Sequence, residues 1–170
     1  MDILKKNYFD LFNIKVGIEI SISSLNDQYT FLQQKFHPDK YVNATNHEKR
    51  LAMQISSHIN DAYTTLGDLV KRIEYILKIN NFSQDESITL KDEKFLLEQI
   101  EYNEFIEDIK NKNKNEINSY KKNITKKVSD TIENIKKFFN NNDFENMSNN
   151  LSKLRFYIRH INEITNLLGN

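Results

Sequence analysis

Glycine and proline are scarce in this chain, and their scarcity restricts its possible folds more than any other feature. The 170 residues include three glycines and one proline. Sheets and their tight turns usually draw on both residue types, whereas helix interiors exclude them. We therefore expect an all-α fold. The length suits one domain or two small ones.

Helical periodicity appears on both sides of the single proline. One helix is expected to end at Pro38, because the residue before a proline is driven out of the helical region. Ser24 and Asp27 have the spacing of a capping box at its start. Its apolar positions recur at steps of four, three and four: Leu25, Tyr29, Leu32 and Phe36.

A second long helix is expected from about residue 44 to residue 66, followed by a short helix from Asp68. Gly67 between them suits a helix C-cap. The core-facing stripe of the long helix has helical spacing: Leu51, Ile55, Ile59, Ala62 and Leu66.

The second half of the sequence contains longer helical patterns. Residues 79–91 have the polar composition of a linker, and three patterns follow at about 92–112, 114–139 and 143–168. Asp143 is a candidate N-cap of the last helix. Helices joined by short turns usually pack antiparallel, so we expect an antiparallel three-helix bundle here.

The formal charges cancel, with 24 Lys and Arg against 24 Asp and Glu. This balance argues against bulk attraction to nucleic acid or to an anionic membrane. Acidic residues gather in 84–109 and lysines in 110–137. We interpret the two runs as solvated faces of neighbouring helices that attract each other weakly.

Cysteine is absent. Its absence excludes disulfides, thiolate metal sites and a cysteine nucleophile, and it suits a reducing compartment. The first twelve residues, "MDILKKNYFDLF", lack the pattern of a secretory signal. No apolar run approaches the roughly 18 residues of a membrane-spanning helix. The sequence therefore favours a cytoplasmic location.

The stretch "KFHPDKY" places the one proline between two polar side chains, His37 and Asp39. Three interpretations are open: a plain turn after a helix, a metal site, or a His/Asp acid–base pair. The other histidines show no ligand spacing with His37, and no nucleophile is paired nearby. The tripeptide alone therefore favours the plain turn.

The surrounding residues change that balance. An aromatic opening helix (Tyr8, Phe9, Leu11) precedes the pattern Leu25, Tyr29, Leu32, Lys35, Phe36, His37-Pro38-Asp39-Lys40, and the next helix carries Ile59-Asn60-Asp61-Ala62-Tyr63 and Leu66. Over roughly residues 7–78, this set resembles the J-domain, a co-chaperone module that acts on heat-shock ATPases of the 70-kDa class.

The resemblance implies that the loop and the helix before it dock on the chaperone and trigger ATP hydrolysis there. It assigns chaperone binding to Lys35, His37, Pro38, Asp39 and Lys40. J-domains usually carry several basic residues on that helix, whereas Gln28, Thr30, Gln33 and Gln34 here are uncharged. Electrostatic steering towards the chaperone should therefore be weak.

The helix expected from residue 92 has two apolar sides. At 100° per residue, one side collects the residues expected in the core: Phe95, Tyr102, Phe105, Ile106 and Ile109. The opposite side collects Leu96, Leu97, Ile100, Glu101 and Glu104. A core helix does not need a second apolar stripe, so this one is expected to be an exposed binding patch with a polar rim. The alternative is that it packs on the first domain.

The last helix has its own expected seam, and one aromatic residue lies off it. The seam positions alternate at steps of three and four: Phe144, Met147, Leu151, Leu154, Ile158 and Ile161. Phe156 lies well away from that stripe. An aromatic side chain in such a place is often only half-buried surface.

The order of motifs along the chain is "YFDLF", "FHPDKY", "INDAYTTL", "FLLEQIE" and "KLRFY". This plan resembles the HscB-type co-chaperones of iron–sulfur cluster biogenesis. The resemblance implies a J-domain over 1–78, a linker over 79–91 and a three-helix scaffold-binding domain over 92–170. It assigns scaffold binding to Leu96, Leu97, Ile100, Glu101, Glu104 and Phe156. Asn103 stands where the family often has an arginine, which puts any ion pair there in doubt.

The expected function is that of an adaptor. The chain would bind an IscU-type scaffold protein, deliver it to an HscA-type chaperone and stimulate that chaperone's ATPase. The resemblance implies no enzyme activity, no cofactor, no metal site, and no nucleic-acid or membrane partner. Two alternatives remain: a general protein-folding J-domain co-chaperone with a helical client-binding tail, and a helical module with a coincidental loop.

Overall fold

The computed structural model describes residues 3–82 and 92–169. Every regular element in those residues is helical, which confirms the all-α expectation. The chain divides into two compact units, Met1–Asn80 and Asn81–Asn170. A linker is expected over residues 79–91, and most of it, residues 83–91, lies outside the described residues. Its first residue, Ile79, is the last residue of a helix.

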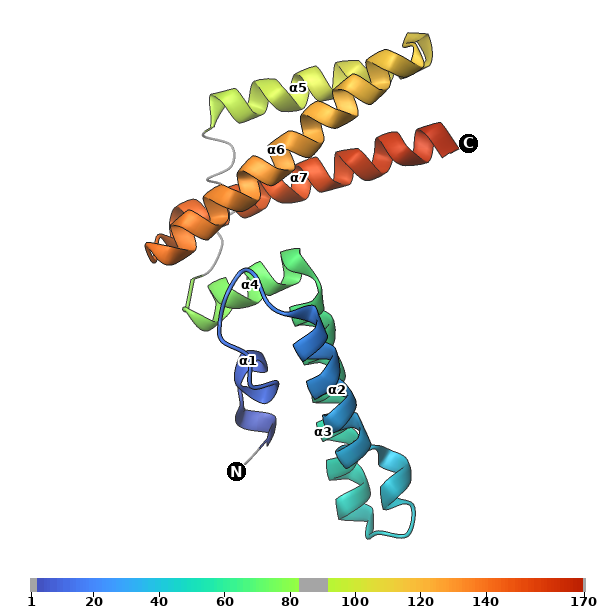
Figure 1. Ribbon diagram of the computed structural model, residues 1–170, viewed down its shortest axis with the longest axis vertical. Coiled ribbons are helices and arrows are strands. Elements are labelled where there is room, and N and C mark those ends of the chain that lie inside the picture. The colour runs from blue at the N-terminus through green and yellow to red at the C-terminus, as the bar shows by residue number, and fades with distance from the viewer. Residues whose placement is uncertain (1–2, 83–91, 170) are drawn as a thin grey trace. The chain divides into compact units, whose positions relative to one another are not determined.

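The first unit is built around a helical hairpin (Figure 1). Its α-helices are α1 (Tyr8–Leu11), α2 (Ile22–Phe36), α3 (Asn46–Gly67) and α4 (Leu69–Ile79), with 3-10 turns η1 (Ile3–Lys5) and η2 (Pro38–Tyr41). The largest fully buried side chains of this unit are all apolar: Phe9, Phe12, Leu25, Ile59, Leu66, Ile73 and Ile76. This core fixes α1 and α4 on the base of the hairpin.

Helix starts in the first unit depend on capping side chains. Ser21, and not the expected Ser24, caps α2 by accepting a hydrogen bond from the Ser24 amide. Thr45 and Glu48 form a reciprocal capping box at the start of α3. Capping leaves fewer amides without partners in the first turn, so these polar residues set where each helix begins.

The core stripe of α3 differs at one position from the expectation. Leu51 is 40% exposed, while Ala52 beside it is buried. Ala52, Ile59 and Leu66 repeat every seven residues and therefore share one helix face. Leu51 lies one residue off that repeat, about 100° around the helix, so its side chain cannot reach the core.

Arg72 is a buried cation that ties loops to helices in the first unit. Its side chain is 7% exposed, and Nε donates to the Ile18 carbonyl at 2.9 Å while Nη1 donates to the Leu66 carbonyl. Burial lowers the pKa of the guanidinium, and the nearby Asp68 opposes that shift. These two hydrogen bonds to carbonyl oxygens offset part of the cost of removing the guanidinium from water.

The second unit contains three long helices, α5 (Glu93–Glu107), α6 (Lys114–Asn140) and α7 (Phe144–Gly169), with the 3-10 turn η4 (Ile109–Asn111) after α5. Figure 1 shows α6 and α7 running side by side in opposite directions, as expected for an antiparallel bundle. Asp143 caps α7 as expected, accepting from the Asn146 amide at 3.1 Å.

An aromatic layer holds α5 on the other two helices. Phe95 packs with Ile124 of α6 and Tyr157 of α7, and Phe105 stacks on Tyr120 of α6 at 3.7 Å between ring centroids. The large rings fill the space between the helices. Each buried ring contributes a large apolar area, so this layer supplies most of the cohesion between α5 and the α6/α7 pair.

The buried stripe of α7 differs from the expected seam. Ile158 and Ile161 are only half-buried, and Tyr157 and Ile164 take the buried places. The reason is that α7 faces α6 and α5 together, so its buried surface is broader than a single seam. The predicted attraction between the acidic and basic runs is seen in an ion pair between Glu98 of α5 and Lys127 of α6, and a local ion pair between Asp108 and Lys112 also joins the two runs.

Candidate functional site: two exposed surfaces

The first surface is the loop after α2. His37 has extended backbone angles, φ −60° and ψ 130°, as expected for a residue before proline. Pro38 then opens the turn η2, in which the Lys40 amide donates to the His37 carbonyl at 3.0 Å. Pro38 therefore ends α2 and begins η2 after it, and its ring restricts the backbone at the junction.

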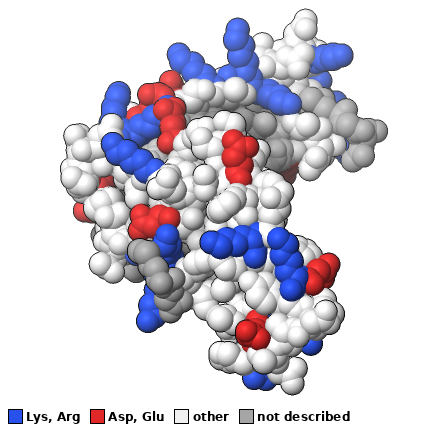
Figure 2. Space-filling model, turned by 60° about the horizontal axis from the view of Figure 1, so that its bottom comes forward, with Lys and Arg blue, Asp and Glu red and all other residues white. Residues whose placement is uncertain are grey.

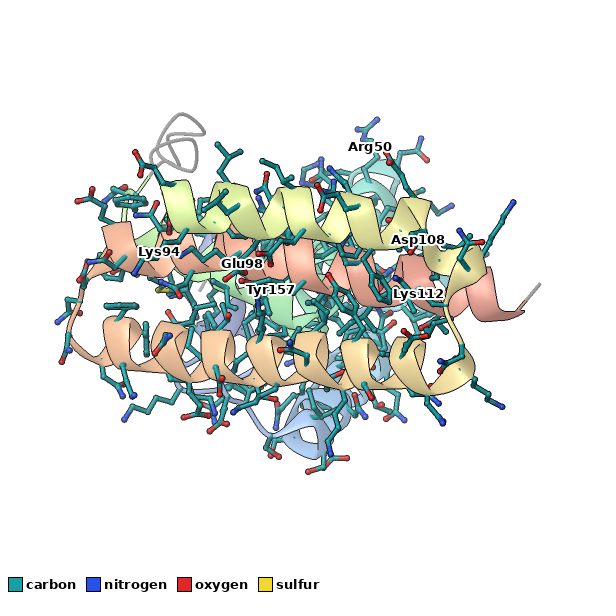
Figure 3. All side chains as sticks on the ribbon, turned by 90° about the horizontal axis from the view of Figure 1, so that it is seen from above. Arg50, Lys94, Glu98, Asp108, Lys112 and Tyr157 are labelled. Atoms are coloured by element: carbon teal, nitrogen blue, oxygen red, sulfur yellow. The ribbon has the colours of Figure 1, made fainter. Side chains whose placement is uncertain are left out.

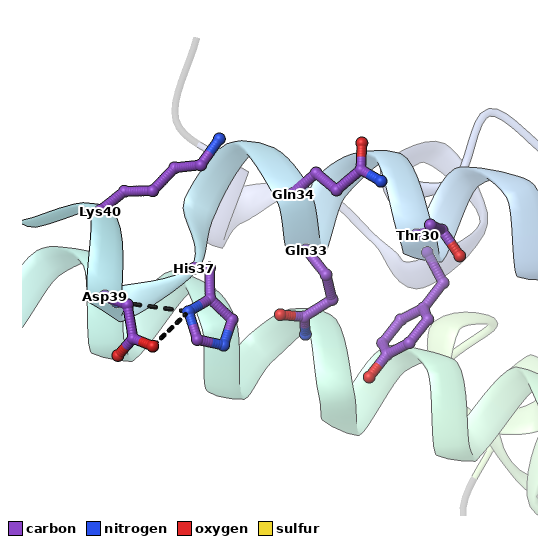
Figure 4. A pocket seen from close by; sticks show the side chains of 7 residues that line it. Thr30, Gln33, Gln34, His37, Asp39 and Lys40 are labelled. Carbon is purple, nitrogen blue, oxygen red and sulfur yellow. Dashed lines mark hydrogen bonds and ion pairs between the residues drawn. The ribbon is translucent and has the colours of Figure 1, made fainter.

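The two polar side chains beside Pro38 contact each other within the loop (Figure 4). The Asp39 amide donates to His37 Nδ1 at 3.3 Å, and Asp39 Oδ2 lies 3.6 Å from the same nitrogen. The side chains are 52% and 86% exposed. One imidazole nitrogen thus shapes the turn, and the rest of both groups is available to a partner.

The loop opens onto a groove along α2. Figure 4 shows the residues that line it: Tyr29, Thr30, Gln33, Gln34, His37, Asp39 and Lys40. Lys35 is exposed outside the groove, with its Nζ 5.4 Å from the centre of the Phe36 ring. Three of the five residues assigned to chaperone binding, His37, Asp39 and Lys40, therefore line one groove, while Pro38 lies in the loop between them and Lys35 lies in the last turn of α2.

A polar ladder fixes the groove's helix against α3. Asn60 Oδ1 accepts from Tyr29 Oη at 3.0 Å and from Gln33 Nε2 at 2.6 Å. Tyr63 Oη donates to Asn26 at 2.9 Å, and its ring stacks on Tyr29. Sequence reasoning missed this role of Asn60, since the "NDAY" spacing shows its partners only when the hairpin is formed.

The second surface lies on α5. Leu96, Leu97 and Ile100 are 45%, 60% and 47% exposed, whereas Phe95 and Tyr102 are 3% and 2% exposed. Glu101 and Glu104 are exposed as well. The helix is thus apolar on two sides, and the side away from the bundle combines three large aliphatic groups with carboxylates.

Phe156 is placed differently from an ordinary surface aromatic. It is half-buried and packs edge-on against Phe95 at 5.2 Å and Tyr102 at 5.8 Å between ring centroids. The Arg159 guanidinium lies 6.0 Å from its ring centre. Phe156 therefore belongs to the layer between α5 and α7 and exposes only part of its ring.

His160 is a buried histidine that sequence reasoning did not single out for a role. It is 4% exposed, and both ring nitrogens are buried without a hydrogen-bond partner in the described residues. Its ring contacts those of Tyr102 and Phe156. Burial, with a smaller effect of Arg159, lowers the pKa of His160 to about 4. The imidazole is neutral in the folded bundle at ordinary pH.

Neither a three-ligand metal site nor a membrane-spanning helix is found in the described residues. Within residues 3–82 and 92–169, no group of three or more His, Asp or Glu side chains could hold a metal ion. In the same ranges, no helix is long and apolar enough to cross a membrane. Figure 2 shows basic and acidic side chains interspersed on the face that it displays, so that face presents no single-sign field.

A family model and curated relatives match parts of the sequence. The model described as the HSCB C-terminal oligomerisation domain matches residues 91–165. The co-chaperone protein HscB homolog of Shewanella pealeana is 40% identical over 105 residues, 61% of this chain and 60% of that protein. The homolog of Colwellia psychrerythraea is 41% identical over the same shares. The match thus spans about three fifths of the length of these relatives.

Two solved structures match nearly all of the fold. The chaperone HscB from Vibrio cholerae has a TM-score of 0.90 at 29% identity, covering 96% of this chain and 98% of that one. The human co-chaperone protein HscB has a TM-score of 0.86 at 25% identity, covering 95% and 81%. The domain model, the sequence identity to these relatives and the shared fold make this chain similar to the HscB co-chaperones.

Proposed function

We propose that this chain is a co-chaperone that binds an IscU-type iron–sulfur scaffold protein and delivers it to an HscA-type heat-shock chaperone. It stimulates the ATPase of that chaperone and so aids the maturation of iron–sulfur proteins. The observation that carries the proposal is the presence of two exposed surfaces on separate compact units in a chain that is similar to HscB co-chaperones.

The first unit is the chaperone-facing part, a J-domain over residues 1–78. The loop His37-Pro38-Asp39, with Lys35 and Lys40 beside it, docks on the chaperone. The exposure of His37 and Asp39 supports this role, since both side chains can be covered by a partner without unfolding the loop. ATP hydrolysis takes place in the partner, so the chain is an activator and not itself an enzyme.

The second unit is the scaffold-facing part, a three-helix domain over residues 92–170. Leu96, Leu97 and Ile100 form the apolar centre of the interface, and Glu101 and Glu104 form its rim. Burying these three half-exposed aliphatic side chains is favourable, at about 25 cal/mol per Å² of apolar area, and the part of this gain that exceeds the cost of association appears as affinity. Phe156 contributes the exposed part of its ring to the interface, and the rest of the ring packs against Phe95 and Tyr102 of α5.

The remaining parts of the proposal concern location and composition. The chain acts in the cytoplasm, with no nucleic-acid or membrane partner, and it needs no cofactor. The cluster is carried by the scaffold, because the chain has no cysteine with which to ligate iron.

The test is an ATPase assay on the chaperone, with the chain and the scaffold added separately and together. The proposal predicts stimulation by the chain alone and a greater than additive rate with both. A general protein-folding co-chaperone would instead bind many apolar peptides and show no synergy with a folded scaffold. Absence of any stimulation would contradict the J-domain assignment.

A further inference from the structure

Glu98 is an acidic residue of α5 that points into the bundle. Its neighbours Leu97 and Ile100 belong to the exposed surface, whereas the Glu98 side chain is only 33% exposed. A carboxylate in such a place loses part of its hydration, and it is retained only where other groups replace the lost water. The contacts of Glu98 show which groups do so.

One oxygen of Glu98 joins α5 to both other helices. Tyr157 of α7 donates its hydroxyl to Oε2 at 2.5 Å, and Lys127 Nζ of α6 lies 3.0 Å from the same atom. Lys127 Nζ also lies 5.8 Å from the centre of the Tyr157 ring. Figure 3 shows Glu98 and Tyr157 close together between α5 and α6.

The Tyr157 hydroxyl is a permanent donor to this carboxylate. Its residue is 5% exposed, and burial together with the hydrogen bond to Glu98 raises the pKa of the phenol above its ordinary value. The hydroxyl therefore stays protonated at any ordinary pH. Hydrogen bonds to a charged acceptor are shorter, stronger and more directional than those between neutral groups.

The Glu98 contacts add to two other directional contacts that join the α5 segment to α7, from Lys153 to Asp92 and from Tyr102 to Glu163. The aromatic layer between α5 and α7 holds the helix by apolar contact, which is not directional and tolerates small rotations of the helix. Rotating α5 about its axis would move Leu97 and Ile100 around the helix and change the surface shown to a partner. The Glu98 contacts resist that rotation, because the carboxylate must stay within reach of two fixed helices.

We propose that Glu98, Tyr157 and Lys127 are positioning residues for the scaffold-docking surface of α5. None of them needs to touch the scaffold. They hold α5 at the rotation that presents Leu97 and Ile100. This inference rests on the proposed function and adds that the affinity for the scaffold is set partly from inside the bundle.

The first test measures scaffold binding to the full chain. Tyr157→Phe removes one hydroxyl, and Glu98→Gln keeps an acceptor for Tyr157 but loses the charge pair with Lys127. Each variant should bind the IscU-type scaffold roughly three- to tenfold more weakly, the range expected from losing one net hydrogen bond. Most of that loss should appear as faster dissociation. The double variant should lose less than the product of the two single effects, since both changes disturb one network.

The matched control makes the same chemical change in the other unit. Tyr63→Phe also removes a tyrosine hydroxyl that donates to a side chain, here Asn26. It should leave scaffold affinity within about twofold of the parent, because Tyr63 and its partner Asn26 belong to the other compact unit and lie outside the network of Glu98, Tyr157 and Lys127. An equal loss of affinity in this control would overturn the inference.

The second test is amide hydrogen exchange, which separates positioning from general stability. Tyr157→Phe should speed exchange along α5 while the buried centre of α6, around Ile124 and Ile135, keeps its protection. Equal acceleration in all three helices would show that the network only stabilises the bundle. Affinity within about twofold of the parent in both network variants would likewise overturn the proposal.

Failure of the proposed function gives a different result. If the parent chain binds no IscU-type scaffold, the proposed function is wrong whatever the variants do. If the parent binds and the network variants bind equally well, the proposed function stands and the positioning role is wrong.

Discussion

The two units present the residues proposed for binding in opposite ways. In the first unit, His37 and Asp39 lie at the tip of a hairpin, and the ladder that supports them is made by other residues, Asn60 and Tyr63. In the second unit, the proposed docking surface and the core share one helix, where the exposed Leu96 lies beside the buried Phe95. A side chain at the tip can therefore be replaced at little cost in stability. On α5, replacing a buried side chain also shifts the exposed side chains of the same helix.

The supports also differ in chemistry. The hairpin is aligned by hydrogen bonds between neutral side chains, and α5 is held by aromatic rings with a few charged contacts at Asp92, Glu98 and Tyr102. Hydrogen bonds fix a register, while apolar packing mainly supplies cohesion. Activation of the chaperone and binding of the scaffold should therefore respond to different kinds of substitution.

The largest effect is expected at the tip. Asp39→Ala or His37→Gln should abolish chaperone ATPase stimulation and change the free energy of unfolding by about 0.5 kcal/mol or less, because both side chains are exposed. Asp130→Ala, which removes an exposed carboxylate from α6, is the control and should stimulate normally. ATPase rates and urea melts check both halves. A His37 variant that stimulates the chaperone ATPase as well as the parent would contradict the role of the tip in activation.

The outer side of α5 should give the next largest effect. Replacing Leu96, Leu97 and Ile100 together by alanine should lower scaffold affinity at least tenfold, the equivalent of about 1.4 kcal/mol. The bundle should still fold, since the three side chains are about half exposed. Truncating the fully buried Leu154 to alanine should instead cost about 2–5 kcal/mol of stability. A folded triple variant with parental affinity in calorimetry would show that this surface is not the docking site.

Phe156 should show both effects at once. Because its ring packs on Phe95 and Tyr102 and is also partly exposed, Phe156→Ala should lower the stability by about 1–3 kcal/mol and weaken scaffold binding. Urea unfolding and binding measurements on one protein sample compare the two losses. Unchanged stability would mean that Phe156 contributes only to the docking surface.

His160 makes the second unit sensitive to acid. Its pKa is about 4 in the folded chain, below the roughly 6.5 of an unfolded histidine. As the pH falls, the histidine therefore takes up a proton in the unfolded chain first. Its contribution to the free energy of unfolding is fully present above about pH 6.5, where the imidazole is neutral in both states. Between about pH 6.5 and 4 the loss should reach on the order of 2 kcal/mol. His160→Leu should remove this slope in urea melts, and the exposed His47→Gln should keep it. An unchanged slope in His160→Leu would contradict the assignment.

The smallest effect is expected from salt. Lys35 and Lys40 are the basic residues at the tip and its helix end, and the groove is otherwise lined by uncharged side chains and Asp39. The association rate with the chaperone should therefore fall only mildly between low and physiological ionic strength. Stopped-flow measurements at several salt concentrations check this. A steep fall would indicate that further basic residues take part.

Periodicity predicted the two sides of α5 because each residue's direction follows from the helical step alone. It failed on α7, where Tyr157 and Ile164 displace Ile158 and Ile161 from the buried stripe. Helix α7 faces both α5 and α6, and the spacing of apolar residues in the sequence does not show on which side the second neighbour lies. The start of α2 was missed for a related reason, since Ser21 and Ser24 are equal capping candidates until the preceding backbone is placed.

Long-range polar contacts were the least predictable part of both surfaces. The glutamate at position 98 was counted among solvated charges, and the contacts with Tyr157 and Lys127 depend on three helices meeting. The motif around His37 was visible because it is local and its proline restricts the backbone wherever it occurs. Local geometry is therefore readable from sequence, while support between elements appears only in the fold.

The most direct test compares three proteins in one chaperone ATPase assay, each with and without the scaffold. The parent should stimulate alone and show synergy with the scaffold. Asp39→Ala should lose both, and the Leu96/Leu97/Ile100 alanine variant should keep the stimulation but lose the synergy. That pattern would show that the tip activates the chaperone and the α5 surface supplies the scaffold. Synergy retained by the triple variant, or stimulation retained by Asp39→Ala, would contradict the division of labour between the two units.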